Sequence, residues 1–435
     1  MNPRVKVLGA LTVTLLTLAV ACSSGEDTSA PGTPADDGGA PDAPISTSDD
    51  ATTTDPGTPD AGDDSATVAR ICSDDDVCHT VLPPKSLVRD VWSAGDGIVW
   101  SVTWSDQQLI ASPGSILRWD GTAWTEVYKD PLRLHAVWGT SATDIWVGGD
   151  SGLFHGTGPS SDKLTWKKVL SGPITTIWGT NANDVWAAGG TLTYIYEYNG
   201  KVFHYSGTGS ADSSDAWELD PISTSRPLSG LKIWGSSKDD VWLSAVETNN
   251  CSFCNGGTHG LLYRRRLQDG VMTFVQESAV ELGGNASSTG SLIASGASFG
   301  PDHVWFGANI AVDWDPSYDA LFTGTKKTDG SGDFDWSHSS FNTCRSSDGR
   351  TGCKGIWYTR AIWGTSANDV YIAGDGGQLR HWDGTKFSFV KTTVQQIPEA
   401  TNFKAMWGSS SDDLWIVGDQ IALHKIAHKP SASAQ

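Results

Sequence analysis

Basic residues are scarce in this sequence, which has 30 Lys and Arg against 50 Asp and Glu and a formal net charge of −20. Part of the imbalance is local, because 14 acidic residues and a single basic one lie between Cys22 and Val77. The remaining globular part keeps a charge of about −9. Binding to nucleic acid needs a basic stripe that matches the phosphates. The composition therefore excludes nucleic acid as the partner.

Amphipathic helices and catalytic motifs are also missing from the part of the sequence that follows the N-terminal segment. Nothing resembles a serine-nucleophile elbow or a phosphate-binding glycine loop. The Ser-x-Asp-x-Gly-x-x-Trp box of sialidase-like glycosidases has no strict match, and Arg345, Arg350 and Arg360 form no recognisable set. We therefore expect an all-β protein in which ligand binding is favoured over catalysis, and we assign no catalytic residue.

Cysteine is limited to seven residues. An even number of cysteines in an exported chain favours disulfides. Cys251-Ser-Phe-Cys254 could instead belong to a zinc or redox site, but no second Cys or His pair and no following helix supports either. Apart from Cys22, the cysteines form three sequence-local pairs, which we predict to be disulfides: Cys72 with Cys78, Cys251 with Cys254, and Cys344 with Cys353.

The first 22 residues have the pattern of an export signal. Arg4 and Lys6 precede a mostly apolar run that is too short to span a bilayer as a helix in the mature protein. Small residues followed by Cys22 resemble a bacterial lipobox, although Ala19 stands where that pattern prefers Leu. The resemblance implies that Cys22 carries a lipid and anchors an outer-membrane lipoprotein, either periplasmic or surface-exposed. An ordinary secretory signal is the alternative.

Residues 23–68 contain almost no large apolar side chain and consist mainly of Ser, Thr, Pro, Gly, Ala and Asp. Such a segment cannot bury enough surface to offset its chain entropy, so we expect a disordered linker. Its r.m.s. reach as a flexible coil is about 35–40 Å. We assign residues 69–427 to one folded domain and residues 428–435 to a disordered tail.

A repeat of tryptophans runs through the predicted domain. Trp138-Gly-Thr-Ser-Ala-Thr-Asp-Ile-Trp146 returns from Trp178 to Trp186, with an aspartate six residues and an aromatic residue eight residues after the first tryptophan. Self-similarity at intervals of roughly 40 to 68 residues is typical of a repeat architecture. The seven copies begin near Trp92, Trp138, Trp178, Trp234, Ser295, Trp363 and Trp407, of which the first lacks the aspartate and the fifth is looser.

Each copy predicts four short strands. In the sixth copy they are residues 360–363, 370–373, 378–382 and 386–390, and Asp383-Gly384 is a hairpin signal between the last two. The last copy lacks a fourth strand, whereas residues 78–82 form an orphan one, since Val81 precedes Trp92 by the same eleven residues that separate Val127 from Trp138. We therefore predict a seven-bladed β-propeller of four-stranded antiparallel blades, closed by an N-terminal strand that completes the last blade.

The segment Ala-Val-Trp-Gly-Thr-Ser-x-x-Asp-Ile-Trp-Val-Gly-Gly-Asp, followed by His381-Trp-Asp-Gly-Thr in the sixth copy, resembles repeats of bacterial surface lipoproteins. These are loosely grouped with BNR and kelch-like propellers. The resemblance covers about residues 78–427. It implies the architecture and supplies no activity.

Most tryptophans and the repeated aspartates fall at equivalent positions, so we interpret them as inter-blade packing and structural caps. Function is expected in the variable connections, which cluster on one face in blades 3–5. Aromatic residues off the repeat suit stacking on a ligand. The predicted binding residues on this face are Trp104, Asp313, Trp314, Asp315, Tyr318, Asp319, Trp357 and Tyr358. Asp150, Asp375 and Asp419, each twelve residues after a repeat tryptophan, are candidates for the mouth of that face, with turn chemistry as the alternative.

We expect no cofactor and no metal, with one weaker candidate. Asp313, Asp315 and Asp319 offer oxygen ligands suited to calcium, but the glycine and distal glutamate of an EF-hand loop are absent. The sequence thus predicts a monomeric, membrane-tethered propeller that binds a polysaccharide or a protein ligand outside the cytoplasm. A glycan-active hydrolase or lyase and a structural envelope component are the alternatives.

Overall fold

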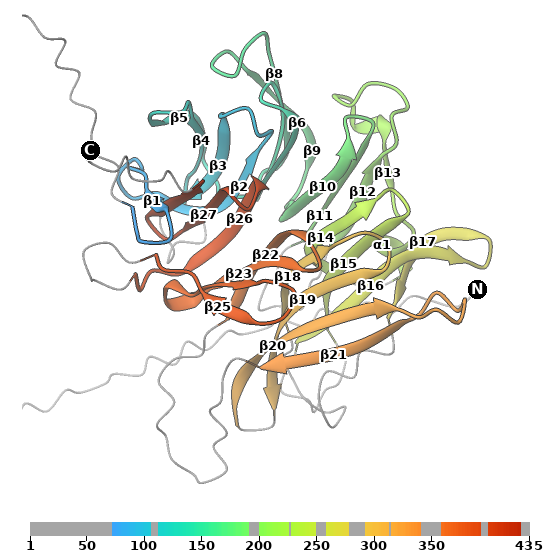
Figure 1. Ribbon diagram of the computed structural model, residues 1–435. Coiled ribbons are helices and arrows are strands. Elements are labelled where there is room, and N and C mark those ends of the chain that lie inside the picture. Colours follow the sequence, from blue (N-terminus) through green and yellow to red (C-terminus); the bar gives the residue numbers. More distant parts are fainter. Residues whose placement is uncertain are drawn as a thin grey trace, which may run out of the picture. The chain divides into compact units, whose positions relative to one another are not determined.

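Seven four-stranded antiparallel sheets follow one another around a ring in the computed structural model, which confirms the predicted seven-bladed β-propeller (Figure 1). The structure describes residues 72–105, 112–190, 200–225, 228–248, 258–277, 292–312, 315–340, 358–392 and 399–427. All of them belong to the unit Thr67–Gln435, which is separate from the unit Met1–Ala66. Some of the predictions concern residues that lie outside the described ones, including Cys22, Cys251, Cys254, Cys344 and Cys353.

The strands of each blade run in chain order from the inner to the outer position, except in the last blade. Blades 1–3 comprise β2 (Leu87–Ser93), β3 (Val99–Trp104), β4 (Gly114–Trp119), β5 (Trp124–Asp130), β6 (Leu134–Ser141), β7 (Asp144–Gly149), β8 (Gly152–Thr157), β9 (Thr165–Ser171), β10 (Thr176–Asn181), β11 (Asp184–Gly189), β12 (Lys201–Tyr205) and β13 (Trp217–Leu219). Blades 4 and 5 comprise β14 (Leu228–Ser237), β15 (Asp240–Thr248), β16 (Thr258–Gln268), β17 (Val271–Gln276), β18 (Leu292–Ser298), β19 (His303–Val312), β20 (Asp315–Lys326) and β21 (Phe334–Ser340).

Blades 6 and 7 comprise β22 (Thr359–Ser366), β23 (Asp369–Gly374), β24 (Leu379–Trp382), β25 (Phe387–Phe389), β26 (Phe403–Ser410), β27 (Asp413–Gly418), β28 (Ile421–Ile426) and β1 (Val77–His79). The described helical pieces are one short α-helix, α1 (Ile222–Ser225), and two 3-10 turns, Ser214–Ala216 and Asp375–Gly377.

The two ends of the described chain close the ring. Strand β1 pairs with β28, with Val77 opposite Lys425 and His79 opposite Leu423. The predicted disulfide between Cys72 and Cys78 is present and lies at this strand. On the inner side, each first strand contacts the first strands of both neighbouring blades, including β26 with β2. The expected closure by an N-terminal strand is therefore confirmed.

The repeat tryptophan of one blade packs against a glycine of the next blade. A Cβ atom on Gly179 would lie 2.8 Å from the ring of Trp138, and one on Gly235 would lie 2.8 Å from Trp178. Only glycine leaves room for such an approach. The same relation joins Trp92 to Gly139 and Trp363 to Gly408, and Phe299 takes the place of the tryptophan against Gly364 after the looser fifth copy.

The second aromatic residue of the repeat packs against outer-strand aromatics of the following blade. Trp146 of blade 2 meets Trp217 of blade 3 with ring centroids 5.2 Å apart, and Trp186 of blade 3 meets Phe274 of blade 4 at 5.6 Å. Trp415 of blade 7 contacts Trp124 of blade 1 at 5.5 Å. Edge-to-face pairs of this kind contribute about 0.5–1.5 kcal/mol each beyond the area they bury. The predicted packing role of these tryptophans is confirmed.

Two connections expected as loops are largely strand. The sequence pattern predicts a loop at residues 309–319, but β19 runs to Val312 and β20 starts at Asp315, with Asn309 opposite Asp319 and Val312 opposite Asp315. Likewise β15 and β16 extend into 247–260, with Thr248 opposite Thr258. The β-branched and aromatic residues of these insertions lengthen the existing ladder. The insertions therefore lengthen the hairpins between the second and third strands of blades 4 and 5.

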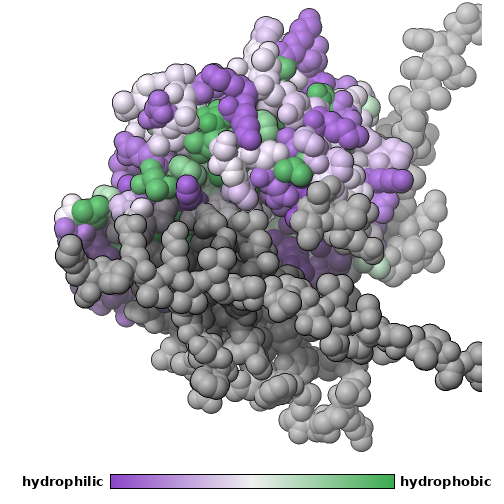
Figure 2. Space-filling model, turned by 180° about the vertical axis from the view of Figure 1, so that it is seen from behind, coloured by the Kyte–Doolittle hydropathy of each residue, from purple (hydrophilic) through white to green (hydrophobic). Residues whose placement is uncertain are grey.

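The described outer surface carries no broad apolar face in the view of Figure 2, where apolar residues form small separate groups among hydrophilic ones. The most exposed large apolar side chains come from different blades, for example Val81 (81% exposed) and Phe389 (67% exposed). Leu267 and Val271 lie together at the tip of the β16–β17 hairpin. Scattered exposed apolar residues are normal for a soluble surface.

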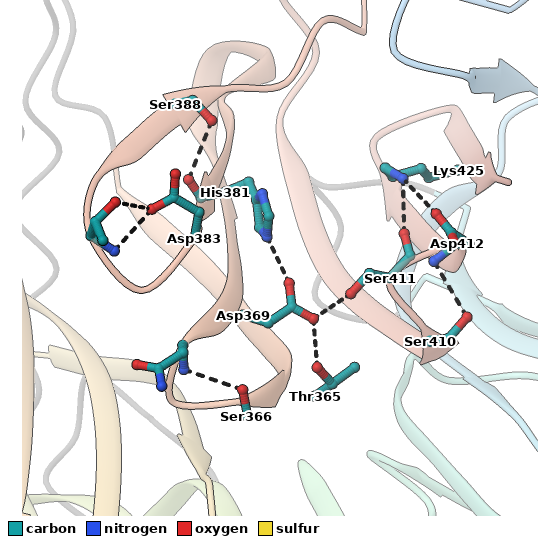
Figure 3. Close-up of polar contacts among 12 residues, drawn as sticks. Thr365, Ser366, Asp369, His381, Asp383, Ser388, Ser410, Ser411, Asp412 and Lys425 are labelled. Atoms are coloured by element: carbon teal, nitrogen blue, oxygen red, sulfur yellow. Dashed lines mark hydrogen bonds and ion pairs between the residues drawn. The ribbon is translucent and has the colours of Figure 1, made fainter. Parts of the chain in front are cut away.

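The repeated aspartates connect the inner strands to the third strands. In blade 6 the carboxylate of Asp369 accepts hydrogen bonds from Thr365 at 2.5 Å and from Ser411 of blade 7, and it contacts His381 Nε2 at 2.6 Å (Figure 3). The ring of His381 stacks on Tyr371, with centroids 4.3 Å apart. Asp144, Asp184 and Asp413 form the same carboxylate–histidine contact with His155, His204 and His424. The structural role predicted for these aspartates holds, and the histidine partner is an addition.

We predict that Gly179→Ala destabilises the propeller by about 1–3 kcal/mol, because overpacking of a filled interior has this cost. The new methyl group would meet Trp138 at 2.8 Å and the backbone oxygen of Asp184 at 2.4 Å. Urea unfolding measures the loss. Lys167→Ala, at an exposed position of β9, is the control and should change stability by less than about 0.5 kcal/mol. An unchanged midpoint for Gly179→Ala would contradict the packing argument.

Acid is expected to destabilise the protein through the aspartate–histidine contacts. Burial opposes the effect, yet hydrogen bonds from His204 and Thr180 hold the pKa of Asp184 below its ordinary value, and the pKa of Asp144, Asp369 and Asp413 is lowered in the same way. Their stabilisation is therefore fully present above the unfolded pKa of about 3.9 and is lost as the pH falls through the lower folded values.

The free energy of unfolding measured from pH 7 to pH 2 checks this pH dependence. Asp184→Asn should lower stability at pH 7 by about 1–3 kcal/mol, since it removes hydrogen bonds to a charged group, and it should flatten the acid limb. Acid limbs of equal slope in the variant and the unaltered protein would show that Asp184 does not contribute to acid sensitivity.

Candidate functional site

A β-bulge interrupts the inner strand of most blades three residues before the repeat tryptophan. The ladder between the first and second strands shifts at Arg89, His135, Arg360 and Lys404. A bulged residue is left unpaired in the ladder, and its side chain is turned relative to the alternating pattern. All four of these side chains line a cavity at the centre of the ring. The bulges thus place cationic groups on the channel wall.

The central cavity has a volume of about 160 Å³ and receives residues from every blade. Its lining consists of Arg89, Asp90, His135, Thr175, Lys232, Ser295, Gly296, Arg360, Ala361, Ile362, Lys404, Ala405 and Met406. An apolar cavity of about this size holds one benzene-sized ligand. The space therefore suits one small chemical group.

The residues that stand twelve positions after the repeat tryptophan contact the bulge residues at the end of the channel. Three of the described blades place an aspartate there: Asp150, Asp375 and Asp419. The backbone N–H of Asp150 donates to Arg133 O at 2.9 Å, and that of Asp375 donates to Tyr358 O at 3.1 Å. Both carbonyls lie two residues before a bulge. These bonds hold each carboxylate beside the cation of its own blade.

Ion pairs link blades 6, 7 and 1 at this end of the channel. Arg360 donates two hydrogen bonds to Asp375, from Nε to Oδ1 at 3.0 Å and from Nη2 to Oδ2 at 2.9 Å. Lys404 Nζ lies 3.9 Å from Asp375 Oδ1 and 3.6 Å from Asp419 Oδ2. Arg89 Nη1 lies 3.2 Å from Asp419 Oδ1. Cations and carboxylates therefore alternate across two blade boundaries.

The series continues into blade 2 through Trp104. This residue occupies the same repeat position as the three aspartates, and the guanidinium carbon of Arg89 lies 4.0 Å from its ring centroid. The indole N–H donates to Leu134 O at 2.7 Å, and the ring meets His135 edge-on at 5.3 Å. His135 Nε2 then contacts Asp150 Oδ1 at 2.6 Å. We call the series Arg360, Asp375, Lys404, Asp419, Arg89, Trp104, His135 and Asp150 the mouth arc.

Burial perturbs the charged groups of the mouth arc. It lowers the pKa of Arg89 and of Lys404, although Asp419 opposes the effect on both. Burial also opposes the ionisation of Asp150, but hydrogen bonds and positive charge from His135 and Arg133 hold its pKa below the ordinary value. The carboxylate of Asp150 is thus kept ionised, whereas the two cations stand in a partly dehydrated wall.

Asp90 stabilises the wall of the cavity by bonding to the backbone. Its carboxylate accepts backbone N–H bonds from Val91 at 3.0 Å and from Val137 of the next blade at 3.0 Å. Burial raises the pKa of Asp90, and the positive charge of Lys232 opposes the rise. Within the described residues, the side chain of Lys232 makes no hydrogen bond or ion pair. One cation of the wall therefore remains uncompensated by direct contact.

The structure brings only part of the predicted binding set together. Trp104 belongs to the mouth arc. Tyr358 contacts the arc at Arg360, whose guanidinium carbon is 4.8 Å from the tyrosine ring centroid. Asp313, Trp314 and Trp357 lie outside the described residues. Asp315, Tyr318 and Asp319 lie on β20, where the backbone alone is described. Their role in binding stays a prediction.

Sequence reasoning missed the bulge position. Arg89, His135, Arg360 and Lys404 all stand three residues before the repeat tryptophan. Their shared offset was a usable signal, because a position that varies within a regular repeat marks a place that the scaffold does not constrain. Of the aspartates expected at the mouth, Asp150 pairs with Arg133, Asp375 with Arg360 and Asp419 with Lys404.

Neither a metal-binding cluster nor a membrane-spanning helix is found among the residues that the structure describes. Among them, no group of three or more His, Cys, Asp or Glu residues could hold a metal ion. The calcium candidate at Asp313, Asp315 and Asp319 falls on residues whose side chains are not described, so it stays a prediction. No helix of the described segments is long and apolar enough to cross a membrane.

Similarity to known proteins is found in the fold. No protein-family model matches this chain, and no curated protein matches it in sequence. The extracellular domain of a hybrid two-component system from B. thetaiotaomicron is similar with a TM-score of 0.55 and 12% identity, over 82% of this chain and 40% of that one. This chain thus spans less than half of that protein.

Two further solved structures have the same architecture. YCF48 from Cyanidioschyzon merolae is similar with a TM-score of 0.52 and 11% identity, over 81% of this chain and 99% of that one. PorZ, a surface component of the type IX secretion system of Porphyromonas gingivalis, has a TM-score of 0.51 and 13% identity, over 80% of this chain and 47% of that one. These structural neighbours are β-propellers, and so is this protein.

Proposed function

We propose that the protein is an extracytoplasmic binding propeller, tethered to the outer membrane through a lipid on Cys22. It binds a polysaccharide or a protein ligand on the face at which the mouth arc lies. The single observation that carries this proposal is the series of polar side chains from Arg360 to Asp150 around one end of the channel, joined by ion pairs and by the ring contacts of Trp104.

The arrangement of the mouth arc fits ligand recognition better than scaffold support. The blades are already joined by aromatic packing and by the contacts of the first strands. Bidentate arginine–carboxylate pairs and partly buried lysines add little net stability to such a core, because dehydration offsets their attraction. Convergent polar groups at a concave site are instead typical of ligand pockets.

Two solved neighbours are compatible with a place outside the cytoplasm. One is described as an extracellular domain and the other as a bacterial surface component. At 12% and 13% identity this is an analogy of fold, so it supports the proposal only together with the export signal of residues 1–22.

The carboxylates of the mouth arc and of the cavity wall give no support to the alternative of a glycan-active hydrolase or lyase. An acid catalyst needs a carboxyl group with a raised pKa facing the substrate. At the mouth, Asp375 is paired with Arg360 and the pKa of Asp150 is lowered. Asp90 has a raised pKa, but both of its oxygens accept backbone bonds.

A binding screen with envelope polysaccharides and envelope proteins tests the proposed function. Arg360→Ala should raise the dissociation constant of the bound ligand at least tenfold, because arginines at the centre of a binding site contribute strongly to binding. Arg118→Ala is a matched control, since Arg118 lies on β4 and donates to Ser161 away from the mouth. Equal binding by both variants would exclude the mouth arc, and turnover of a glycan in the same screen would favour the hydrolase.

The predicted aromatic rim of the variable loops is tested separately with Trp314→Ala and Trp357→Ala. Loss of a stacking platform should reduce the affinity of the ligand from the same screen by about tenfold in at least one variant. Unchanged affinity in both variants would rule out the rim as a binding surface while leaving the mouth arc in place.

A further inference from the structure

The wall of the central cavity carries a clear excess of positive charge. Four permanent cations line the space, namely Arg89, Lys232, Arg360 and Lys404, whereas Asp90 is the one carboxylate among the lining residues. Both oxygens of Asp90 are already occupied by backbone N–H groups. This local excess lies within a protein whose overall charge is strongly negative.

Several donors of these cations have no acceptor among the described residues. Nε and Nη2 of Arg89 are buried without a hydrogen-bond partner. Lys404 Nζ lies 3.6 Å or more from its nearest carboxylate oxygens, which is beyond hydrogen-bond distance. Lys232 Nζ has neither a hydrogen bond nor an ion pair in the part of the chain described. The two unsatisfied donors of Arg89 are buried, which is unfavourable, and an anion in the cavity would reduce that penalty.

We propose that this cavity binds the carboxylate of an acidic sugar, so that a uronate unit of an acidic polysaccharide enters the channel through the mouth arc. Lys232 and Lys404 bind the carboxylate directly, and Arg89 and Arg360 supply further positive charge behind them. This inference rests on the proposed function and specifies its ligand class.

The charge of the site favours a single negative charge on the ligand. Asp375 and Asp419 neutralise part of the positive charge from behind the wall, through Arg360, Lys404 and Arg89. When Asp90 is included, three carboxylates are set against the four lining cations, and one net positive charge remains. A carboxylate matches this excess, whereas a phosphate carries up to two negative charges near neutral pH.

The composition of the wall favours a sugar over the carboxyl end of a peptide. Thr175, Ser295 and His135 bring hydroxyl and imidazole groups to the lining, which can hydrogen-bond the hydroxyls of a sugar ring. The cavity of about 160 Å³ accommodates roughly one ring, and four apolar side chains, Ala361, Ile362, Ala405 and Met406, line it beside the polar groups. A hydroxylated acid of monosaccharide size fits both properties.

Titration calorimetry of the full-length protein in detergent with sodium glucuronate tests the proposal. A ligand of this size is expected to bind with a dissociation constant of about 1 mM, and glucose, its neutral analogue, should not bind. Lys232→Met should weaken glucuronate binding at least tenfold. Lys238→Met is the matched control on the same blade, because Lys238 is exposed and pairs only with its neighbour Asp239; it should leave binding within twofold.

Lys404→Gln serves as an independent variant, and thermal unfolding shows that each variant is folded. Unchanged glucuronate affinity in both Lys232→Met and Lys404→Gln would overturn the proposal. So would stronger binding of inorganic phosphate, or of a pentapeptide with a free carboxyl end, that is lost in Lys232→Met. If glucuronate fails but a ligand from the envelope screen still depends on Arg360, the ligand class is wrong and the proposed function stands. If neither glucuronate nor any ligand of the envelope screen binds, both the ligand class and the proposed function are wrong.

Discussion

The contact between a tryptophan of one blade and a glycine of the next is the constraint on which the rest of the propeller depends. At Gly179 and Gly235 a single methyl group would enter the ring of the preceding tryptophan. Because the glycine has no side chain, neighbouring inner strands approach closely enough for side chains to bond across the boundary, as Thr176 does with the N–H of Ile233 at 3.0 Å. A narrow channel with a polar wall follows directly from that approach.

The β-bulges give this rigid scaffold its variable positions. Along a regular strand every second side chain must fit the blade interior, and its identity is restricted by packing. The bulged residue is outside this alternation, so arginine, histidine or lysine can occupy it without disturbing the ladder. The same device, repeated in several blades, directs these side chains towards one centre. A functional site can therefore change while the fold stays the same.

The architecture could be predicted from the sequence because the repeat that specifies a blade occurs seven times. Blade number, strand number and closure by an N-terminal strand all follow from spacing, and each is present, although the strand expected at residues 78–82 lies at Val77–His79. The mouth arc could be predicted only in part. Asp150, Asp375 and Asp419 share an obvious Gly-Asp signal, whereas the bulge that turns Arg89 and Lys404 into the channel leaves no mark in composition. The hairpin extensions around residues 309–319 were missed because an insertion between two repeat strands resembles a loop until its pairing register is known.

Trp104 shows how scaffold and site are connected. It stands at the repeat position that carries aspartate in blades 2, 6 and 7, and it covers the guanidinium of Arg89 at 4.0 Å while bonding to Leu134 of the next blade. An aspartate at this position would have given Arg89 a second carboxylate and satisfied its free donors. The indole instead offers only a cation–π contact, which leaves Nε and Nη2 of Arg89 without acceptors. Local departures from the rule that buried polar groups are paired concentrate at functional sites. The substitution of an aromatic ring for a carboxylate thus keeps the positive charge of the cavity available to a ligand.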